Sequence, residues 1–348
     1  MTPQDEEISA EPPVSRCIAR SSVYTFPVPG KRKFDEQLAA LDTLRHGDAA
    51  AAAAPLRKAL GHRNNFVVAK AADIAREFEL KDLTSDLLSA FERFFDDPVK
   101  SDPQCWAKNA ISKTLASFEL QEAGVFLRGL RHIQLEPVWG GVSDSAGTLR
   151  STCAHALVQV RGLRETELLQ YLLELFADKD KSVRAEAARA IETVNSPAAA
   201  LLLRLRASLG SDEPEILGAC YAAILGIEGK SAIPWVARFL DEGDDLSGEA
   251  ALAIAGNRSA DAFQALKQRF EQGRPPDEWF RSVLLSAIAL TRQDEAISFL
   301  LDLVSSRFAE AAVEALLRSG PNDETIAKLE KAVAGNAKLT RMVAARQS

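Results

Sequence analysis

The sequence predicts an all-α protein in which helical hairpins stack along one direction, an architecture called an α-solenoid. Two observations support this prediction: a pattern of apolar and small residues that recurs along the chain, and a composition dominated by Ala and Leu. Stacked hairpins contact only their neighbours, so a chain of 348 residues can exceed the size at which a single compact core stops growing.

The recurring pattern is clearest between Asp178 and Asp241. Each unit has an apolar residue, small residues four and seven positions later, and another apolar residue directly after. The two units are Val183, Ala187, Ala190 and Ile191, then Ile216, Cys220, Ala223 and Ile224, an offset of 216 − 183 = 33 residues. Steps of three and four residues place these side chains on one face of a helix. A second, Leu-rich helix follows each, so the unit is a helical hairpin.

The same register can be followed from residue 34 to the end of the chain. Hairpins are expected near residues 34, 67, 107, 149, 183, 216, 246, 280 and 308, which makes about nine units. Leu157 and Ile191 occupy the last position of the pattern in their units, so we expect both to be buried between hairpins.

Residues 1–33 differ from the repeat region 34–348. The segment begins acidic and polar, and prolines at positions 12, 13, 27 and 29 prevent a continuous helix. It is expected to form an extended or disordered N-terminal tail. A second interpretation remains open, in which Tyr24 and Phe26 dock the tail onto the first hairpins.

Composition limits the classes of function. The formal net charge of −7 argues against general nucleic-acid binding, although a local basic groove remains compatible with it. Four cysteines lie far apart without a CxxC pair, so neither a disulfide framework nor a zinc site is expected. No long apolar run or signal-peptide core is evident, so a cytoplasmic location without membrane contact is expected.

Catalytic patterns are sparse. The four histidines form neither a His-Glu pair nor an HExxH motif, and no phosphate-binding GxxxxGK[ST] occurs. Cys105 and Cys153 have no evident base beside them. We therefore expect no cofactor, and a binding protein more than an enzyme.

Several stretches resemble the HEAT-repeat superfamily, in particular the HEAT-like repeats of the phycobilisome-lyase type. Residues 225–234 read LGIEGKSAIP, residues 54–56 read APL at the start of a second helix, and residues 178–184 read DKDKSVR at the entry to a unit. The resemblance implies a right-handed superhelix. The superfamily includes bilin lyases, DNA-repair glycosylases, iron-dependent hydroxylases and scaffolds, and the hydroxylases need His and carboxylate pairs that this sequence lacks.

HEAT-like proteins usually line their concave face with the second helix of each hairpin. On this basis a row of cations is expected there: Arg57, Lys58, Arg93, Arg128, Arg131, Arg204, Arg206, Arg238, Lys267 and Arg269. The row could follow an anionic partner. Alternatively these residues are ordinary solvated side chains paired with nearby Asp and Glu.

The connector of residues 134–148 is unusually long for a repeat protein, and long connectors are often functional. It carries Trp139 and Asp144 and shapes a turn around Pro137 and Gly140-Gly141. The expected binding residues are Trp139, Asp144, Arg150, Arg128, Arg131, His132, Trp106 and Lys108. In the competing interpretation, Trp139 fills a wide seam between two hairpins.

The sequence thus favours a non-catalytic scaffold that binds a protein or peptide on a concave face, and an anionic group on this partner would suit the basic row. Nucleic acid is a less favoured partner. The alternatives are a base-excision glycosylase resembling the HEAT-like alkylpurine enzymes, with Trp106, Trp139 and Asp144 in its site, and a bilin-lyase-like protein.

Overall fold

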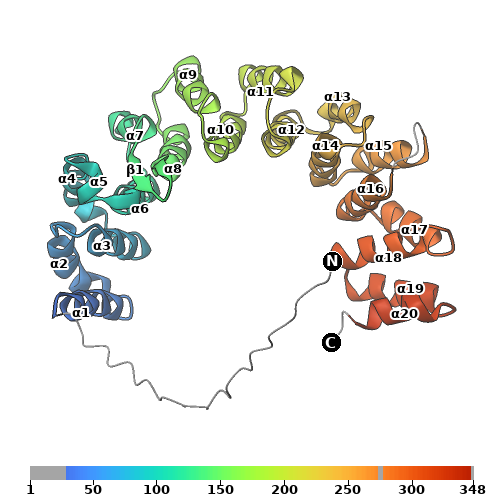
Figure 1. Cartoon of the computed structure of the whole chain (residues 1–348), viewed down its shortest axis with the longest axis horizontal. Helices are drawn as coiled ribbons and strands as arrows, with labels where there is room; N and C mark the ends of the chain where they lie inside the picture. The colour runs from blue at the N-terminus through green and yellow to red at the C-terminus, as the bar shows by residue number, and fades with distance from the viewer. Residues whose placement is uncertain (1–28, 273–276, 346–348) are drawn as a thin grey trace, which may run out of the picture.

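The computed structural model describes residues 29–272 and 277–345, and helices account for most of them. The prediction of an all-α protein is confirmed. The helices follow one another along an open arc, with α1 (Pro29–Leu44) at one end and α20 (Ala337–Ala344) at the other (Figure 1).

The helices form two layers. The inner layer consists of α3 (Asn65–Glu77), α6 (Trp106–Ser117), α8 (Gly147–Val158), α10 (Lys181–Val194), α12 (Pro214–Glu228), α14 (Asp245–Gly256), α16 (Glu278–Leu290) and α18 (Ala309–Arg318). The outer layer consists of α2 (Ala49–Leu60), α4 (Thr84–Arg93), α7 (Ala123–Leu130), α9 (Glu165–Phe176), α11 (Pro197–Leu209), α13 (Ile233–Ala237), α15 (Ala260–Glu271) and α17 (Asp294–Leu303). The helix α19 (Asp323–Val333) and the single turn α5 (Pro98–Ser101) complete the described α-helices.

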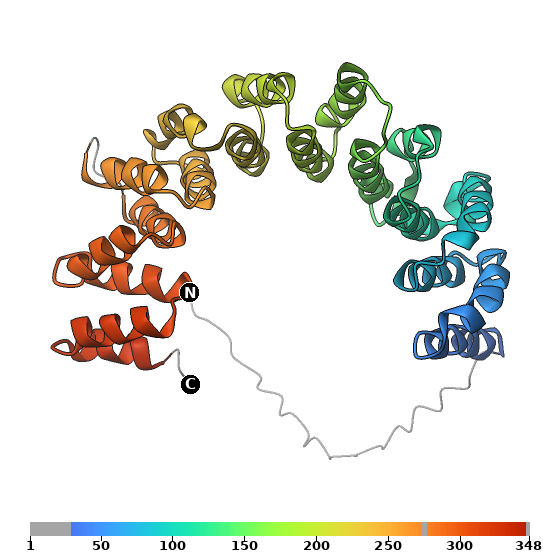
Figure 2. The same ribbon diagram turned by 180° about the vertical axis from the view of Figure 1, so that it is seen from behind.

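The expectation that second helices line the concave face is wrong. Figures 1 and 2 place the first helix of each hairpin on the inside of the arc and the second on the outside. The cause lies in the small-residue pattern, since Ala and Cys on the first helices let these pack closely against each other. The densest helix contacts are accordingly between inner-layer neighbours such as α3 and α6, or α12 and α14.

The predicted register agrees with the positions of the inner helices. A first helix contains each predicted register position except 308, which is the residue directly before α18. Leu157 and Ile191 are fully buried, as predicted.

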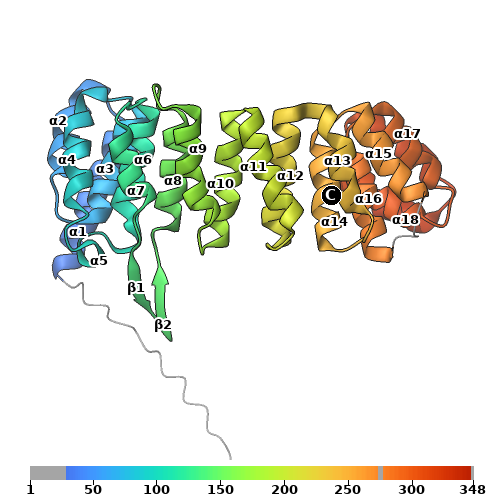
Figure 3. The same cartoon turned by 90° about the horizontal axis from the view of Figure 1, so that it is seen from above.

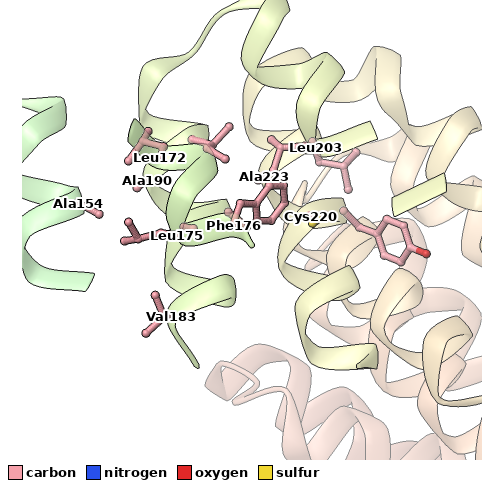
Figure 4. Close-up of a cluster of buried hydrophobic side chains, with 14 of the residues drawn as sticks. Ala154, Leu172, Leu175, Phe176, Val183, Ala190, Leu203, Cys220 and Ala223 are labelled. Carbon is pink, nitrogen blue, oxygen red and sulfur yellow. The ribbon is translucent and has the colours of Figure 1, made fainter. Parts of the chain in front are cut away.

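The buried cluster in Figure 4 shows how the two layers share one core. Val183 and Ala190 come from α10, Cys220 and Ala223 from α12, and Phe176 from the outer helix α9. Burial raises the pKa of the Cys153 and Cys220 thiols to about 12, so both remain uncharged and act as small apolar side chains.

The beginning of the chain is described only in part. The helix α1 begins at Pro29, before the predicted boundary at residue 34. The rest of the predicted tail, including the suggested docking of Tyr24 and Phe26, lies outside the described residues.

The connector folds into a β-hairpin. Strand β1 (Leu135–Val138) pairs antiparallel with β2 (Gly141–Asp144), so that Leu135 lies opposite Asp144 and Val138 opposite Gly141. Gly140 has φ +88° in the turn, which a side chain would strain. Figure 3 shows the hairpin projecting from one edge of the arc, roughly along the direction of the helix axes.

One helical stretch among the described residues, Pro214–Leu240, is apolar and long enough to cross a membrane by composition alone. In this structure 56% of its most apolar window is buried inside the protein. Tyr221, Ile224 and Val236 of this stretch are core residues.

Candidate functional site

The base of the β-hairpin is fixed by a buried arginine. Arg150, in the first turn of α8, is only 4% exposed. Its guanidinium Nη1 lies 2.6 Å from Asp144 Oδ2 and donates to the His132 carbonyl at 3.0 Å, and its Nε lies 2.8 Å from Asp178 Oδ2. Asp144 Oδ1 also accepts the backbone N–H groups of Gln134 and Ala146. Both ends of the hairpin are thereby joined to α8 and to the loop after α9.

A second set of bonds joins β1 to the turn before α6, residues Pro103–Cys105. One carboxylate oxygen of Glu136 accepts from the Gln104 N–H at 2.6 Å, from Gln134 Nε2 at 2.7 Å and from Ser145 Oγ at 2.6 Å. Burial opposes ionisation of this carboxyl, but the hydrogen bonds outweigh it and lower its pKa. Glu136 is therefore an anion held in one position.

The turn beneath Glu136 is strained. Gln104 and Cys105 have φ values of +58° and +55°, in the left-handed region that residues with a side chain rarely adopt. The buried Asp102 stabilises this turn, because its carboxylate accepts the N–H groups of Ala107 and Lys108 at 2.8 and 3.0 Å. Strained turns that are held this firmly occur frequently at functional sites.

A groove lies on the inner layer between α3, α6, the hairpin and α8, with a volume of about 580 Å³. We call it the hairpin groove. Its lining includes Trp106, Asn109, Lys113, Glu136, Val138 and Thr148. Trp106 is 49% exposed, and its ring centroid lies 5.4 Å from that of Phe66. Lys113 is exposed and has no ion-pair partner in the described part of the chain.

The groove continues along the inner layer. A neighbouring hollow of about 420 Å³ shares Lys113 and Thr148 with it and extends over α8 and α10. There His155 Nε2 lies 2.9 Å from Glu186 Oε2. The two hollows adjoin each other on the inner layer beside the hairpin.

The hairpin itself presents an apolar surface. Trp139 at its tip is fully exposed, with a relative exposure of 104%. Four further apolar residues are also mostly exposed, and these are Ile133, Leu135, Val138 and Val142. Several exposed apolar side chains on one rigid element are typical of an interaction site. The interpretation of Trp139 as a seam filler is wrong, because the residue extends beyond the helix layers.

The structure does not bring the other predicted binding residues together at one surface. Lys108 is fully buried, with Nζ 3.0 Å from Asp102 Oδ2, and so cannot contact a partner from the surface. Arg150 and Asp144 fix the base of the hairpin and leave little charge free for a ligand. Of the predicted set, only Trp106 lines the hairpin groove and only Trp139 lies at the exposed tip.

Arg128, Arg131 and His132 lie on the outer side of this region. Arg128 pairs with Glu92 and covers the Phe95 ring. Arg131 pairs with Glu174 at 2.7 Å. His132 packs edge-on against Phe95 and contacts Gln134, and burial lowers its pKa. The two arginines are therefore already neutralised by carboxylates of the chain.

The wider basic row has the same character. Arg57 pairs with Asp86, Arg204 with Glu228 and Arg206 with Asp212. The arginines lie on outer-layer helices, and their charges are already paired with carboxylates of the chain. The interpretation as ordinary paired side chains fits the structure better than a track for an anionic partner.

Sequence reasoning missed Asn109, Lys113 and Thr148. The signal was present, because Trp106, Asn109 and Lys113 recur at steps of three and four on the same helix, and this spacing defines a face. Assigning the concave face to the second helices directed attention away from them.

Comparison with protein-family models and with curated proteins gave no match. Among the described residues, no group of three or more His, Cys, Asp and Glu side chains is arranged to hold a metal ion.

Proposed function

We propose that this chain is a HEAT-like α-solenoid that serves as a protein- or peptide-binding scaffold, with its main contact surface at the β-hairpin and the hairpin groove. The observation that carries the proposal is an apolar hairpin, exposed to its tip at Trp139, whose base is fixed by Arg150 and Glu136. A rigid arm loses little conformational entropy when it binds, so its exposed apolar area contributes efficiently to affinity.

The side chains of the hairpin and the hairpin groove indicate which chemical groups the partner would carry. An apolar segment of the partner would cover Val138 and Trp139, while Trp106 offers a half-exposed ring below. Lys113 supplies a cation without a partner among the described residues, beside the fixed carboxylate of Glu136. An anionic group of the partner would therefore meet Lys113 on the inner layer, and not the arginines Arg128 and Arg131 predicted for that role.

The test begins with identification of the partner. A photo-crosslinking amino acid placed at position 139, in cells that express the protein, is expected to capture one main partner. The same group at Ser208, exposed on the outer helix α11, is the matched control. A partner captured equally from both positions would contradict the proposal.

Affinity for the purified partner then decides the role of the tip. Trp139→Ala is expected to weaken binding by more than about tenfold, or about 1.4 kcal/mol. Because Trp139 has no buried surface to lose, the free energy of unfolding should change by less than about 0.5 kcal/mol. Unchanged affinity with an intact fold would overturn the assignment of the hairpin as the contact surface.

The glycosylase alternative needs Trp106, Trp139 and Asp144 at one surface. Asp144 is engaged by Arg150 and two backbone N–H groups, and Trp139 does not line the groove that contains Trp106. A salt titration of binding to duplex DNA is its direct test, since phosphate contacts give a steep dependence on salt. No observation specifically favours that alternative or the bilin-lyase-like one.

A further inference from the structure

A second groove lies on the inner layer, farther along the arc, where α12, α14 and α16 meet. Its volume is about 360 Å³, and we call it the Trp279 groove. Its floor is apolar: Leu252 and Trp279 are 45% and 47% exposed, and Val283 lies beside them. Half-exposed large apolar side chains on a concave surface leave room for an occupant.

The indole of Trp279 is held in place by a glycine. A Cβ atom at Gly248 would lie 3.1 Å from Trp279 Cη2, so the ring rests directly against the backbone of α14. Its other neighbour is Phe280, whose ring centroid lies 6.2 Å away in a stacked arrangement. The groove therefore presents a fixed aromatic surface.

The wall of the Trp279 groove is acidic. Glu215, Asp245 and Glu249 line it, and Lys181 balances only one of them, with Nζ 3.0 Å from Glu215 Oε2. Glu249 lies over Gly218 of α12, where a side chain would collide with it. Within the described residues, neither Asp245 nor Glu249 has an ion-pair or hydrogen-bond partner.

These carboxylates repel one another. Burial raises the pKa of Glu249, and the neighbouring charges of Glu215 and Asp245 raise it further. A cation placed between Asp245 and Glu249 would relieve this repulsion. An acidic or purely apolar occupant would leave it in place.

We propose that the Trp279 groove binds a basic segment of a partner protein, with an arginine or lysine side chain lying over Trp279 and its charged end between Asp245 and Glu249. The aromatic face attracts a cation, and the methylene stem of such a side chain packs well on Leu252 and Val283. This groove shares no residue with the hairpin groove, so the inference stands or fails independently of the proposed function.

The test uses the full chain and a fluorescein-labelled short peptide of alternating arginine and glycine. The comparison peptide carries citrulline in place of arginine, which keeps the shape and removes the charge. Fluorescence anisotropy is expected to show binding of the arginine peptide and at least about tenfold weaker binding of the citrulline peptide. Equal binding of the two peptides would overturn the proposal.

Protein variants locate the site. Asp245→Asn with Glu249→Gln is expected to weaken binding of the arginine peptide by at least about tenfold. The matched control is Asp294→Asn with Glu295→Gln, which makes the same charge change in the exposed first turn of α17 and should leave affinity within about twofold. Equal losses in both double variants would mean general attraction to an acidic protein and would overturn the site.

Further variants and a displacement measurement complete the test. If the Asp245 and Glu249 double variant melts early, the single Glu249→Gln variant and Trp279→Leu decide instead, each with affinity expected to fall at least about threefold. Trp139→Ala should bind the arginine peptide as the parent protein does, and a loss there would assign the peptide to the β-hairpin and overturn the site. Complete displacement of the peptide by an equal concentration of arginine amide would indicate a small-molecule site. That result would overturn the proposal that the groove binds a protein segment.

Discussion

Asp144, the last residue of β2, and the buried Arg150, in the first turn of α8, form an ion pair at 2.6 Å. The pair joins the only described β-structure to the helical layers, and Asp178 closes it from the other side. Its position explains how a connector can project into solvent without being loose.

Replacement of Arg150 tests this relationship. Arg150→Met leaves the partly buried Asp144 and Asp178 without their cation, so the free energy of unfolding should fall by about 1.5–3 kcal/mol. Denaturant unfolding measures the loss, and hydrogen exchange should show faster exchange of the Ser145 N–H, which is bonded to the Gln134 carbonyl. Arg128→Met, at an exposed pair, is the control and should cost less than about 1 kcal/mol. Similar losses in both variants would show that Arg150 has no special role at the base of the hairpin.

The register of the inner helices can be tested at Leu157. This side chain is fully buried between hairpins, so Leu157→Ala should lower the free energy of unfolding by about 2–5 kcal/mol. Leu201→Ala, at an exposed position of α11, should change it by no more than about 0.5 kcal/mol. Thermal and urea unfolding of both proteins provide the comparison. A mild effect at Leu157 would mean that the core can close over the space left.

The lowered pKa of Asp212 should make the stability of the fold depend on pH. Burial opposes its ionisation, but hydrogen bonds from Arg184 and Arg206 outweigh burial and hold the pKa of this carboxyl well below its usual range. A lowered pKa in the folded state stabilises the fold above the unfolded-state pKa of about 4, and this contribution is lost as the pH falls further. Between pH 7 and pH 3 the melting temperature of the parent protein should therefore fall more steeply than that of Asp212→Asn.

The loss of stability expected for Asp212→Asn can be compared with that of a control variant at an exposed carboxyl. At pH 7, Asp212→Asn should cost about 1–3 kcal/mol, since it removes charge-assisted hydrogen bonds. Asp82→Asn, at an exposed carboxyl, should change neither the stability nor its slope with pH. Parallel pH profiles for the parent and Asp212→Asn would show that Asp212 does not contribute to the pH dependence of stability.

Replacement of Tyr221 by Phe should raise the stability of the fold. Its side chain is fully buried against Trp235 and Phe239, and its hydroxyl has no hydrogen-bond partner among the described residues. Tyr221→Phe removes an unsatisfied polar group, so the free energy of unfolding should rise by about 1 kcal/mol. Tyr171→Phe is the control, because that hydroxyl donates to Glu167 at 2.8 Å near the surface. A drop at Tyr221 of more than about 1 kcal/mol would reveal a bonding partner for the hydroxyl.

Helix periodicity was enough to predict the helical class, the hairpin positions and the burial of Leu157 and Ile191, because a period of three to four residues is a local property. Which layer faces inward depends on how closely neighbouring helices approach each other. Small residues such as Ala187 and Cys220 allow a close approach, but which helices they bring together is known only from the folded structure. The burial of Lys108 and Arg150 could not be predicted from the sequence either, because it depends on ion pairs with Asp102 and Asp178 from other elements. The importance of the connector was predicted, whereas its β-hairpin form was not.

The contact pattern of the arc has a mechanical consequence. Dense packing joins each helix to its neighbours next along the chain, so small rotations at successive seams accumulate. The separation between distant helices such as α6 and α16 is then the most compliant dimension of the molecule (Figure 1). A partner that spans the two grooves would fix that separation, and the arc would work as a spring whose opening is set by the length of what it holds.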